Sequence, residues 1–236
     1  MSTESLLTVS KLQTHIGLFQ ILENVSFDVP EGQITVLLGR NGAGKTTTLK
    51  SIMGITPPSS GTIIFAGKRL NGMTVHDIAR LGIGYVPEHR AIFRNLSVAE
   101  NLRLAERAPG DLARKQDLIF GLFPDLKRLY HLGGGQLSGG QQQMLTIARA
   151  LVPDNRLLLI DEPSEGLAPV LIEQMMQAIR ELSARTTILL VEQNFRMASQ
   201  LADRYVIIDN GQSVHHGLMA DLVQDRALIH RYLGAA

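Results

Sequence analysis

The stretch Val36-Leu37-Leu38-Gly39-Arg40-Asn41-Gly42-Ala43-Gly44-Lys45-Thr46-Thr47 decides the fold of this chain. Its apolar start is typical of a strand, its glycines of a loop, and the residues after it, without Gly or Pro as far as Met53, of a helix. The pattern G-x-x-x-x-G-K-[ST] is filled by Gly39, Gly44, Lys45 and Thr46. In such a loop, backbone amides and the positive end of a helix dipole surround phosphate oxygens. The stretch therefore predicts a phosphate-binding loop between a strand and a helix.

The residues of this loop have expected parts in binding. The phosphate-binding set is expected to be Gly39, Arg40, Asn41, Gly42, Ala43, Gly44, Lys45, Thr46 and Thr47. Lys45 is expected to reach the β- and γ-phosphates, and the hydroxyl of Thr46 to hold Mg²⁺. The alternative is a simple glycine-rich turn between a buried strand and a helix. The turn signal Pro30-Glu31-Gly32 before the apolar run favours the phosphate loop, because strand, loop and helix then follow in the required order.

The composition narrows the class of protein and its partners. A chain of 236 residues can form one large α/β domain with a sizeable core. Cysteine is absent, which excludes disulfide frameworks and cysteine-based metal centres. The first ten residues lack the features of a signal peptide and no long apolar run occurs, so the chain is expected to stay in the cytoplasm. Because the net charge is +1 and tryptophan is absent, nucleic acid is not an expected partner.

Strand patterns stand on both sides of a helical region. Alternation at 7–12 and 25–29 indicates an antiparallel sheet near the start. Further strands are predicted at 34–38, 62–66, 81–86, 156–160, 186–191, 205–208 and 212–214, the last two as a hairpin. Helices are predicted at 47–53, 169–183, 195–202 and 219–233. Residues 90–151 read as a helical insert, which Ser97-Val98-Ala99-Glu100 opens with a capping box.

Two acidic residues end the apolar run Leu157-Leu158-Leu159-Ile160-Asp161-Glu162. A buried parallel strand would deliver both carboxylates to the sheet edge where the phosphate loop lies. Asp161 is then expected to accept from the magnesium shell, and Glu162 to take a proton from an attacking water. The alternative is an acidic strand end that caps the helix beyond Pro163.

A second candidate phosphate site is Leu137-Ser138-Gly139-Gly140-Gln141. Ser138 and Gln141 fit S-x-x-Q, so a plain capping box is the alternative interpretation. Two adjacent glycines fit that interpretation poorly but suit close backbone contact with an anion at a helix end. Since the first loop already serves one nucleotide, the second helix end is expected to serve a nucleotide held by another subunit.

These motifs resemble those of the ABC-type ATPases. Residues 39–46, 137–141, 160–163 and 164–167 are similar to the Walker A, signature, Walker B and D-loop of that family, in the family's order. The resemblance implies an α/β fold with a P-loop NTPase (RecA-like) core, an antiparallel β subdomain and an inserted helical subdomain. The nucleotide-binding core would comprise 1–89 and 152–236, and the helical subdomain 90–151. The resemblance also implies a head-to-tail dimer. In this dimer each ATP lies between residues 39–46 of one subunit and Ser138, Gly139, Gly140 and Gln141 of the other.

Finer features resemble the F-type ATP-binding subunits of branched-chain amino-acid importers. They are Val86-Pro87-Glu88, residues 161–169 and Val191-Glu192-Gln193-Asn194. This resemblance implies an ATPase on the cytoplasmic face of the inner (plasma) membrane, where a groove within about 90–136 receives a permease. Its implied partners are integral-membrane permease subunits, an identical or different second ATP-binding subunit, and an extracytoplasmic solute-binding protein. The alternatives are an exporter ATPase, such as one for lipopolysaccharide, and a non-transport ABC protein acting on ribosomes or DNA.

Three positions depart from the general ABC pattern. Glu88 stands in place of the usual glutamine and adds negative charge beside the γ-phosphate. Gln193 stands in place of a histidine. Its neutral amide can donate a hydrogen bond but, unlike a histidine, cannot take up a proton and become charged. Ile16 stands where an aromatic residue stacks on adenine, so Ile16 or Phe19 is expected to give only apolar contact. Hydrolysis is still expected, with Glu162, Lys45 and Gln193 as the catalytic set, ATP and Mg²⁺ bound, and Thr46, Asp161 and Glu88 at the metal.

Overall fold

The computed structural model describes residues 5–234, and its strands form one sheet. The strands are β1 (Ser5–Ile16), β2 (Phe19–Pro30), β3 (Ile34–Leu38), β4 (Ser60–Phe65), β5 (Lys68–Arg69), β6 (Ile83–Val86), β7 (Leu157–Asp161), β8 (Thr187–Val191), β9 (Arg204–Asp209) and β10 (Gln212–Leu218). They lie in the order β5-β4-β1-β2-β10-β9-β3-β8-β7-β6. Strands β9, β3, β8, β7 and β6 are parallel neighbours, and the β1, β2 and β4 neighbours are antiparallel.

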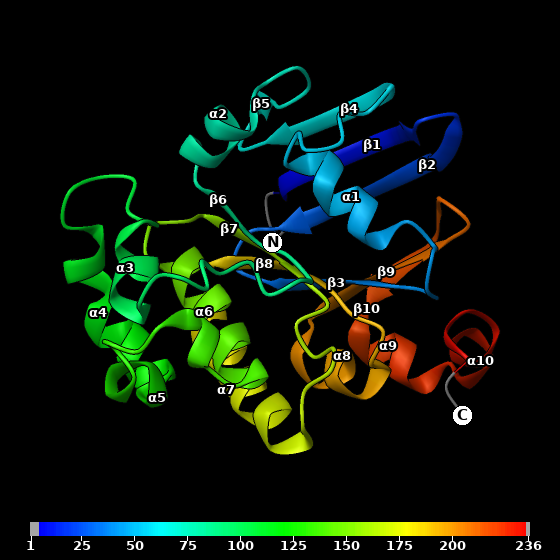
Figure 1. Cartoon of the computed structure of the whole chain (residues 1–236). Coiled ribbons are helices and arrows are strands. Elements are labelled where there is room, and N and C mark those ends of the chain that lie inside the picture. Colours follow the sequence, from blue (N-terminus) through cyan, green and yellow to red (C-terminus); the bar gives the residue numbers. More distant parts are fainter. Residues whose placement is uncertain (1–4, 235–236) are drawn as a thin grey trace.

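Helices cover this sheet and fill most of the middle of the chain (Figure 1). They are α1 (Lys45–Ile52), α2 (Val75–Arg80), α3 (Val98–Arg103), α4 (Asp111–Leu122), α5 (Pro124–Arg128), the 3-10 turn η1 (Gly134–Gln136), α6 (Gly139–Leu151), α7 (Pro169–Ser183), α8 (Phe195–Leu201), α9 (Met219–Gln224) and α10 (Arg226–Leu233). In Figure 1, α3, α4, α5 and α6 gather at one side in green, away from the blue antiparallel strands.

The parallel strands are apolar throughout because both of their faces are buried. Successive side chains of a strand point to opposite faces, so each strand contributes side chains to two hydrophobic cores. In β3, Leu37 packs into one core with Leu49 and Ile52 of α1. Val36 and Leu38 pack into the other core. The first core also holds the inner face of β1, β2 and β4, so α1 is enclosed between the antiparallel strands and the parallel strands. This packing fixes the loop before α1 at the carboxyl end of β3.

The capping box predicted for the helical region forms. The Ser97 hydroxyl accepts from the Glu100 amide at 3.2 Å, and the Glu100 carboxylate accepts from the Ser97 amide at 2.8 Å. The buried Asn101 side chain exchanges hydrogen bonds with the backbone of Phe93, so α3 holds the chain that leads into it. The boundaries of a separate subdomain at 90 and 151 stay a prediction.

Three differences from the predicted elements have local causes. Helix α2 was not predicted; it has only six residues, and the Thr74 side chain caps it by accepting from the Asp77 amide. Strand β6 begins at Ile83, because Gly82 before it has a left-handed φ of 97°. The predicted last helix is two helices, since Asp225 leaves the helical conformation and its carboxylate accepts from the Leu228 amide to begin α10.

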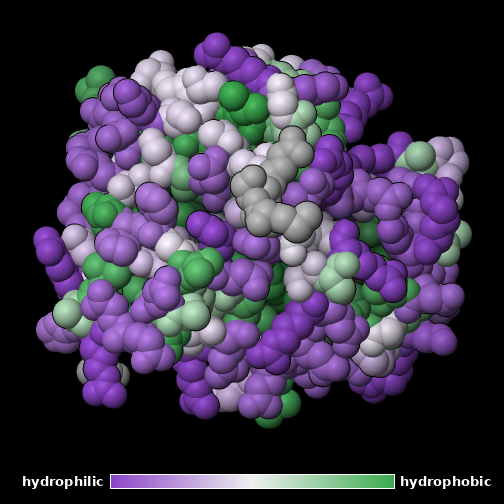
Figure 2. Space-filling view, turned by 180° about the vertical axis from the view of Figure 1, so that it is seen from behind, coloured by the Kyte–Doolittle hydropathy of each residue, from purple (hydrophilic) through white to green (hydrophobic). Residues whose placement is uncertain are grey.

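A helix that crosses a membrane must be both long and apolar. Among residues 5–234, no helix combines the length and apolar character needed to cross a bilayer. The face shown in Figure 2 is mostly hydrophilic, and its hydrophobic residues form separate patches.

Asp111 holds the start of α4, and its removal is expected to lower stability. Its carboxylate accepts from the amides of Arg107 and Ala108 at 3.0 and 2.8 Å and pairs with Arg114. These backbone hydrogen bonds lower the pKa of Asp111. We expect Asp111→Asn to reduce the free energy of unfolding by about 2 kcal/mol at pH 7.

The pH dependence of that loss has a defined sign. A lowered pKa stabilises the fold at any pH above the unfolded value of about 3.9, and this contribution disappears as the pH falls through the folded pKa. Urea unfolding followed by circular dichroism at several pH values tests this, with the exposed Asp117→Asn on the same helix as the control. A deficit for Asp111→Asn that stayed constant from pH 7 to acid would contradict an ionised carboxylate at this position.

Candidate active site

The loop after β3 has the backbone geometry that its glycines allow. Gly39 and Gly44 have φ values of 150° and 109°, in the range that favours glycine. A Cβ on Gly39 would lie 2.1 Å from the carbonyl oxygen of Ile208, so the loop backbone lies directly against β9. Gly44 stands at the N-cap of α1 without a side-chain cap. Glycine is therefore required both for the entry into the loop and for its transition into the helix.

The first turn of α1 leaves backbone donors free. Thr48 donates to the carbonyl of Gly44, but the amides of residues 45–47 donate to no acceptor among residues 5–234. The first turn of α1 also carries no acidic residue. Free amides and the positive end of the helix dipole together favour an anion.

The Lys45 ammonium group is buried and directed at oxygen atoms. Its Nζ donates to the carbonyls of Gly39 and Arg40 at 3.0 and 3.1 Å. Oε1 of Glu162 lies 3.3 Å away, and the Lys45 side chain is 3% exposed. The cation is thus held over the loop, within reach of an anion that the free amides bind.

Glu162 is positioned by both its backbone and its side chain. Its φ of 42° is left-handed, which costs a non-glycine residue about 1–3 kcal/mol. Its amide donates to the Val191 carbonyl at 3.0 Å, and its Oε2 accepts from Nε2 of Gln193. Strands β7 and β8 pair Asp161 with Val191, so the residues after both strands meet at one sheet edge. The carboxylate therefore lies between a cation and an amide donor.

Asp161 is fully buried below the loop. The Thr46 hydroxyl donates to its Oδ1 at 2.9 Å, and the Tyr85 hydroxyl donates to its Oδ2 at 3.2 Å. Burial raises the pKa of Asp161; the two hydrogen bonds oppose this, and the charges of Glu162 and Glu88 add to it. Burial and the charge of Asp161 also raise the pKa of Tyr85, which therefore stays a neutral donor.

Glu192 is a buried acid that the sequence motifs did not single out by itself. It is 1% exposed and accepts from the Ser164 hydroxyl at 3.0 Å and from the amides of Gln193 and Asn194 at 3.2 Å. Burial raises its pKa, and the hydrogen bonds from Ser164 and Asn194 oppose the shift. Glu192 thereby ties the turn after β7 to the turn after β8. Its place at the carboxyl end of an apolar strand, as for Asp161, was the available signal.

One cavity of about 400 Å³ collects most of the predicted residues. It is lined by Ile16, Ile21, Asn41, Gly42, Gly44, Lys45, Thr46, Thr47, Glu88, Glu162, Glu165 and Gln193. Ile21 and Glu165 are additions to the predicted set. Ile16 is half exposed and Phe19 is 76% exposed, so the cavity wall at this end is aliphatic. Arg40 instead points to α10, where its guanidinium donates to the carbonyl of Arg231 at 3.4 Å.

The residues at the start of α6 do not line this cavity. The Ser138 hydroxyl accepts from the Gln141 amide at 3.3 Å, and Oε1 of Gln141 accepts from the Ser138 amide at 2.9 Å, which completes a capping box. The cap forms although two glycines follow Ser138, and Gly140 has a packing reason besides anion contact. A Cβ there would lie 2.2 Å from Cδ1 of Leu171 in α7. The amides of Gly139 and Gly140 donate to no acceptor among residues 5–234, and their contact with a phosphate stays a prediction.

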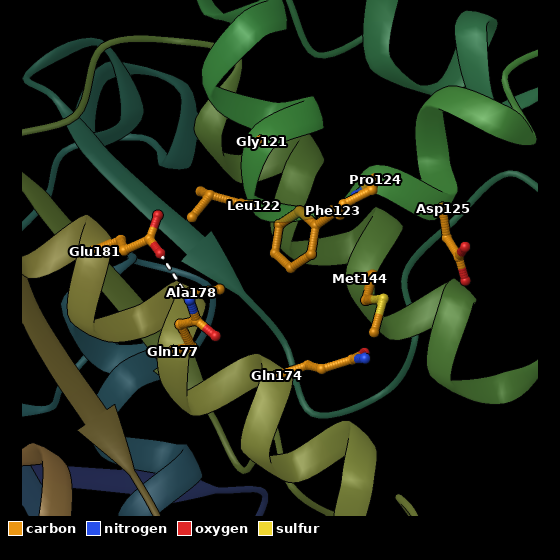
Figure 3. A pocket seen from close by; sticks show the side chains of 10 residues that line it. All are labelled: Gly121, Leu122, Phe123, Pro124, Asp125, Met144, Gln174, Gln177, Ala178 and Glu181. Carbon is orange, nitrogen blue, oxygen red and sulfur yellow. Dashed lines mark hydrogen bonds between the residues drawn. The ribbon is translucent and has the colours of Figure 1, made fainter.

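A second cavity of about 360 Å³ lies apart from these groups (Figure 3). The ring of Phe123 and the side chain of Met144 point into it, and Gln174, Gln177 and Glu181 of α7 form its other wall. None of the predicted catalytic residues lines it. Because its lining offers neither a lysine nor an arginine, it does not suit a polyphosphate.

The first cavity has the chemistry needed to cleave a phosphoanhydride. Free amides and Lys45 can hold phosphate oxygens, and Thr46 and Asp161 present hard oxygen ligands. Glu162, at the cavity wall, can accept a proton from a water molecule. Gln193 can orient that carboxylate, since its amide donates to it.

Known proteins are similar to this chain in sequence and fold. Residues 22–165 match the profile of the family described as ABC transporter. The chain is 41% identical over 232 residues to the high-affinity branched-chain amino acid transport ATP-binding protein BraG of Pseudomonas aeruginosa, covering 97% of this chain and 100% of that protein. It is 34% identical over 220 residues to the lipopolysaccharide export system ATP-binding protein LptB of Escherichia coli, covering 91% of each. The ADP conformation of an ATP-binding cassette of an ABC transporter superposes with a TM-score of 0.86 at 26% identity, covering 99% of this chain and 100% of the other.

Proposed function

We propose that this chain, which belongs to the ABC transporter family and is an ATP-hydrolysing transporter subunit, energises the import of branched-chain amino acids. The main support for ATP hydrolysis is the cavity that Lys45, Thr46, Glu162 and Gln193 line together. The similarity to BraG along nearly the whole chain supports the solute class. Residues 39–47 hold the phosphates of ATP, and Ile16 gives apolar contact to the base.

Hydrolysis follows from the positions of the charged groups. Lys45 stabilises negative charge on the β- and γ-phosphates, because its ammonium group is buried and water screens it little. Glu162 accepts a proton from the attacking water, and Gln193 keeps its carboxylate directed at that water. The left-handed backbone conformation of Glu162 is unfavourable in free energy, and the need to place its carboxylate here explains why it is kept.

Mg²⁺ suits the oxygen donors below the loop. Residues 5–234 hold no cluster of three or more His, Asp or Glu side chains suited to a metal, so the phosphates must supply part of the ligand set. Thr46 and Asp161 would hold the ion, with Glu88 at the cavity wall. Burial raises the pKa of Asp161 and the charges of Glu162 and Glu88 add to the shift; a divalent cation would offset those two charges. When bound, Mg²⁺ neutralises charge on the β- and γ-phosphate oxygens.

Removal of Mg²⁺ is expected to stop hydrolysis. In a phosphate-release assay, excess chelator should lower the rate by about 10²-fold or more, and added Mg²⁺ should restore it. Asp161→Asn should require more Mg²⁺ for half-maximal rate, because a neutral amide is the weaker ligand. A rate that is indifferent to the chelator would remove the metal from the reaction.

The enclosure of ATP requires a second ATP-binding subunit. The cavity holds none of Ser138, Gly139, Gly140 and Gln141, although α6 begins with two free amides. We infer that these residues close over the γ-phosphate of the nucleotide in the partner subunit. The helices of 90–151 form the subdomain that contacts integral-membrane permease subunits at the cytoplasmic face, and a solute-binding protein delivers the amino acid.

Export of lipopolysaccharide is the second candidate function, and the similarity to LptB supports it. Uptake of radiolabelled leucine separates the two functions in a deletion strain that lacks other leucine importers. Deletion should lower uptake about tenfold or more, and the wild-type gene, but not Glu162→Gln, should restore it. Unchanged leucine uptake with lipopolysaccharide retained in the inner membrane would replace the import proposal by the exporter.

A further inference from the structure

The guanidinium group of Arg90 lies at the start of α6. A Cβ built on Gly139, the first residue of this 13-residue helix, would lie 2.5 Å from Nη1 and 2.8 Å from Cζ of Arg90. A Cβ on Gly166, in the turn after β7, would lie 3.7 Å from Nη2. Arg90 thus stands between the two segments that resemble the signature and the D-loop. Glycine at 139 leaves the space that the guanidinium occupies.

This position is electrostatically unfavourable unless an anion joins it. The start of a helix carries partial positive charge, so a cation there is repelled by the free amides. Within residues 5–234, the Arg90 side chain forms neither an ion pair nor a hydrogen bond. A carboxylate that would offset its charge is therefore missing from the described part of the chain. The group is exposed, so an anion carried by another molecule can reach it.

The nucleotide cavity has the opposite imbalance. Glu88, Glu162 and Glu165 line it, the buried Asp161 accepts from its lining residue Thr46, and Lys45 is the cation among its lining residues. Glu88 stands where the family pattern has a neutral glutamine, and Gln193 where it has a histidine that can carry a proton. Glu88 therefore adds a negative charge near the γ-phosphate, and Gln193 removes a possible positive charge from it. A further cation at this phosphate would offset the difference.

We propose that Arg90 supplies this cation in trans, by contacting the γ-phosphate of the ATP bound to the partner subunit. The proposal rests on the composite site inferred above and adds a nucleotide-contacting residue to it. Arg90 follows Glu88 by two residues, so one short segment carries the extra negative charge to its own nucleotide and the compensating positive charge to its partner's nucleotide. A planar guanidinium with several donors suits bidentate contact with phosphate oxygens.

The test uses the full-length chain in a Glu162→Gln background, where ATP is held without turnover. Arg90→Ala, Arg90→Lys and the control Arg94→Ala are compared, since Arg94 is an exposed arginine of the same segment. Light scattering with and without MgATP reports dimer formation, and a fluorescent ATP analogue reports binding to the monomer. Matching rates of hydrolysis are measured in the background with Glu162 intact.

We expect Arg90→Ala to weaken the ATP-dependent dimer and to lower hydrolysis by about 10–100-fold, with the monomer's affinity for the analogue unchanged. Arg90→Lys should recover part of both, and Arg94→Ala should match the parent. Retained monomer binding shows that the variant is folded. Dimer formation and hydrolysis by Arg90→Ala equal to the parent would overturn the proposal. If the parent itself stays monomeric with MgATP, the proposed composite site is contradicted, and so is the proposed role of Arg90. A defect limited to Arg90→Ala supports that role and is consistent with the composite site.

Discussion

Replacing Glu162 by glutamine is expected to lower the steady-state rate of ATP hydrolysis by about 10²–10⁴-fold, or about 3–5 kcal/mol of activation free energy. The amide has nearly the shape of the carboxylate but cannot accept the proton of the attacking water. The contacts to Lys45 and Gln193 show that the position is held on both sides, so the variant should keep the geometry of the loop. Affinity for ATP should stay within about threefold, because the free amides and Lys45 are unchanged.

Phosphate release measures turnover, and a fluorescent ATP analogue measures binding. Glu173→Gln, on the exposed side of α7, makes the same change of charge away from the cavity and should leave both quantities unaltered. Near-normal turnover by Glu162→Gln would show that another group accepts the proton. Loss of ATP binding by the same variant would show that Glu162 is needed to build the loop.

Gly140→Asp is expected to lower hydrolysis by about 10²–10³-fold while the monomer binds ATP normally. The new carboxylate would stand at the start of α6, where the partner's γ-phosphate is expected, and like charges repel. Its Cβ would also displace Leu171, because the two would be 2.2 Å apart. The cavity around Lys45 contains no part of this helix, so binding to a single subunit has no reason to change.

The control for this variant is Gly121→Asp in α4. It adds the same side chain to a helix at a glycine whose Cβ would meet no atom within 4 Å. Equal losses in the two variants would indicate general damage to the helices. Loss of ATP binding by the Gly140→Asp monomer would contradict the separation of the two half-sites.

The sequence predicted the parts of the site that depend on local chain geometry. The loop at 39–47 and the acids after β7 follow from a glycine pattern and a strand end, and the structure brings these segments together. The predicted ABC family and P-loop fold are confirmed by the relatives and the superposed cassette. The hairpin at Asn210-Gly211 also forms as its turn residues predict, with both φ values positive.

The features that were missed depend on contacts between distant segments. Glu192 binds Ser164 across 28 positions of the chain, and a single acid after a strand does not reveal that partner. The close contact between Gly140 and Leu171 requires the placement of α7 against α6, which no periodic pattern specifies. The break at Asp225 depends on a side-chain cap that competes with continuation of the helix. The amphipathic pattern of apolar residues alone does not distinguish one helix from two.

The central claim is that one chain carries half of each catalytic site. The most direct test measures the rate of ATP hydrolysis per subunit over about a hundredfold range of protein concentration, with light scattering on the same samples. We expect the rate per subunit to rise with concentration and to level off as the ATP-bound dimer forms. A rate per subunit that stays constant across the whole range, in samples that remain monomeric, would contradict the claim.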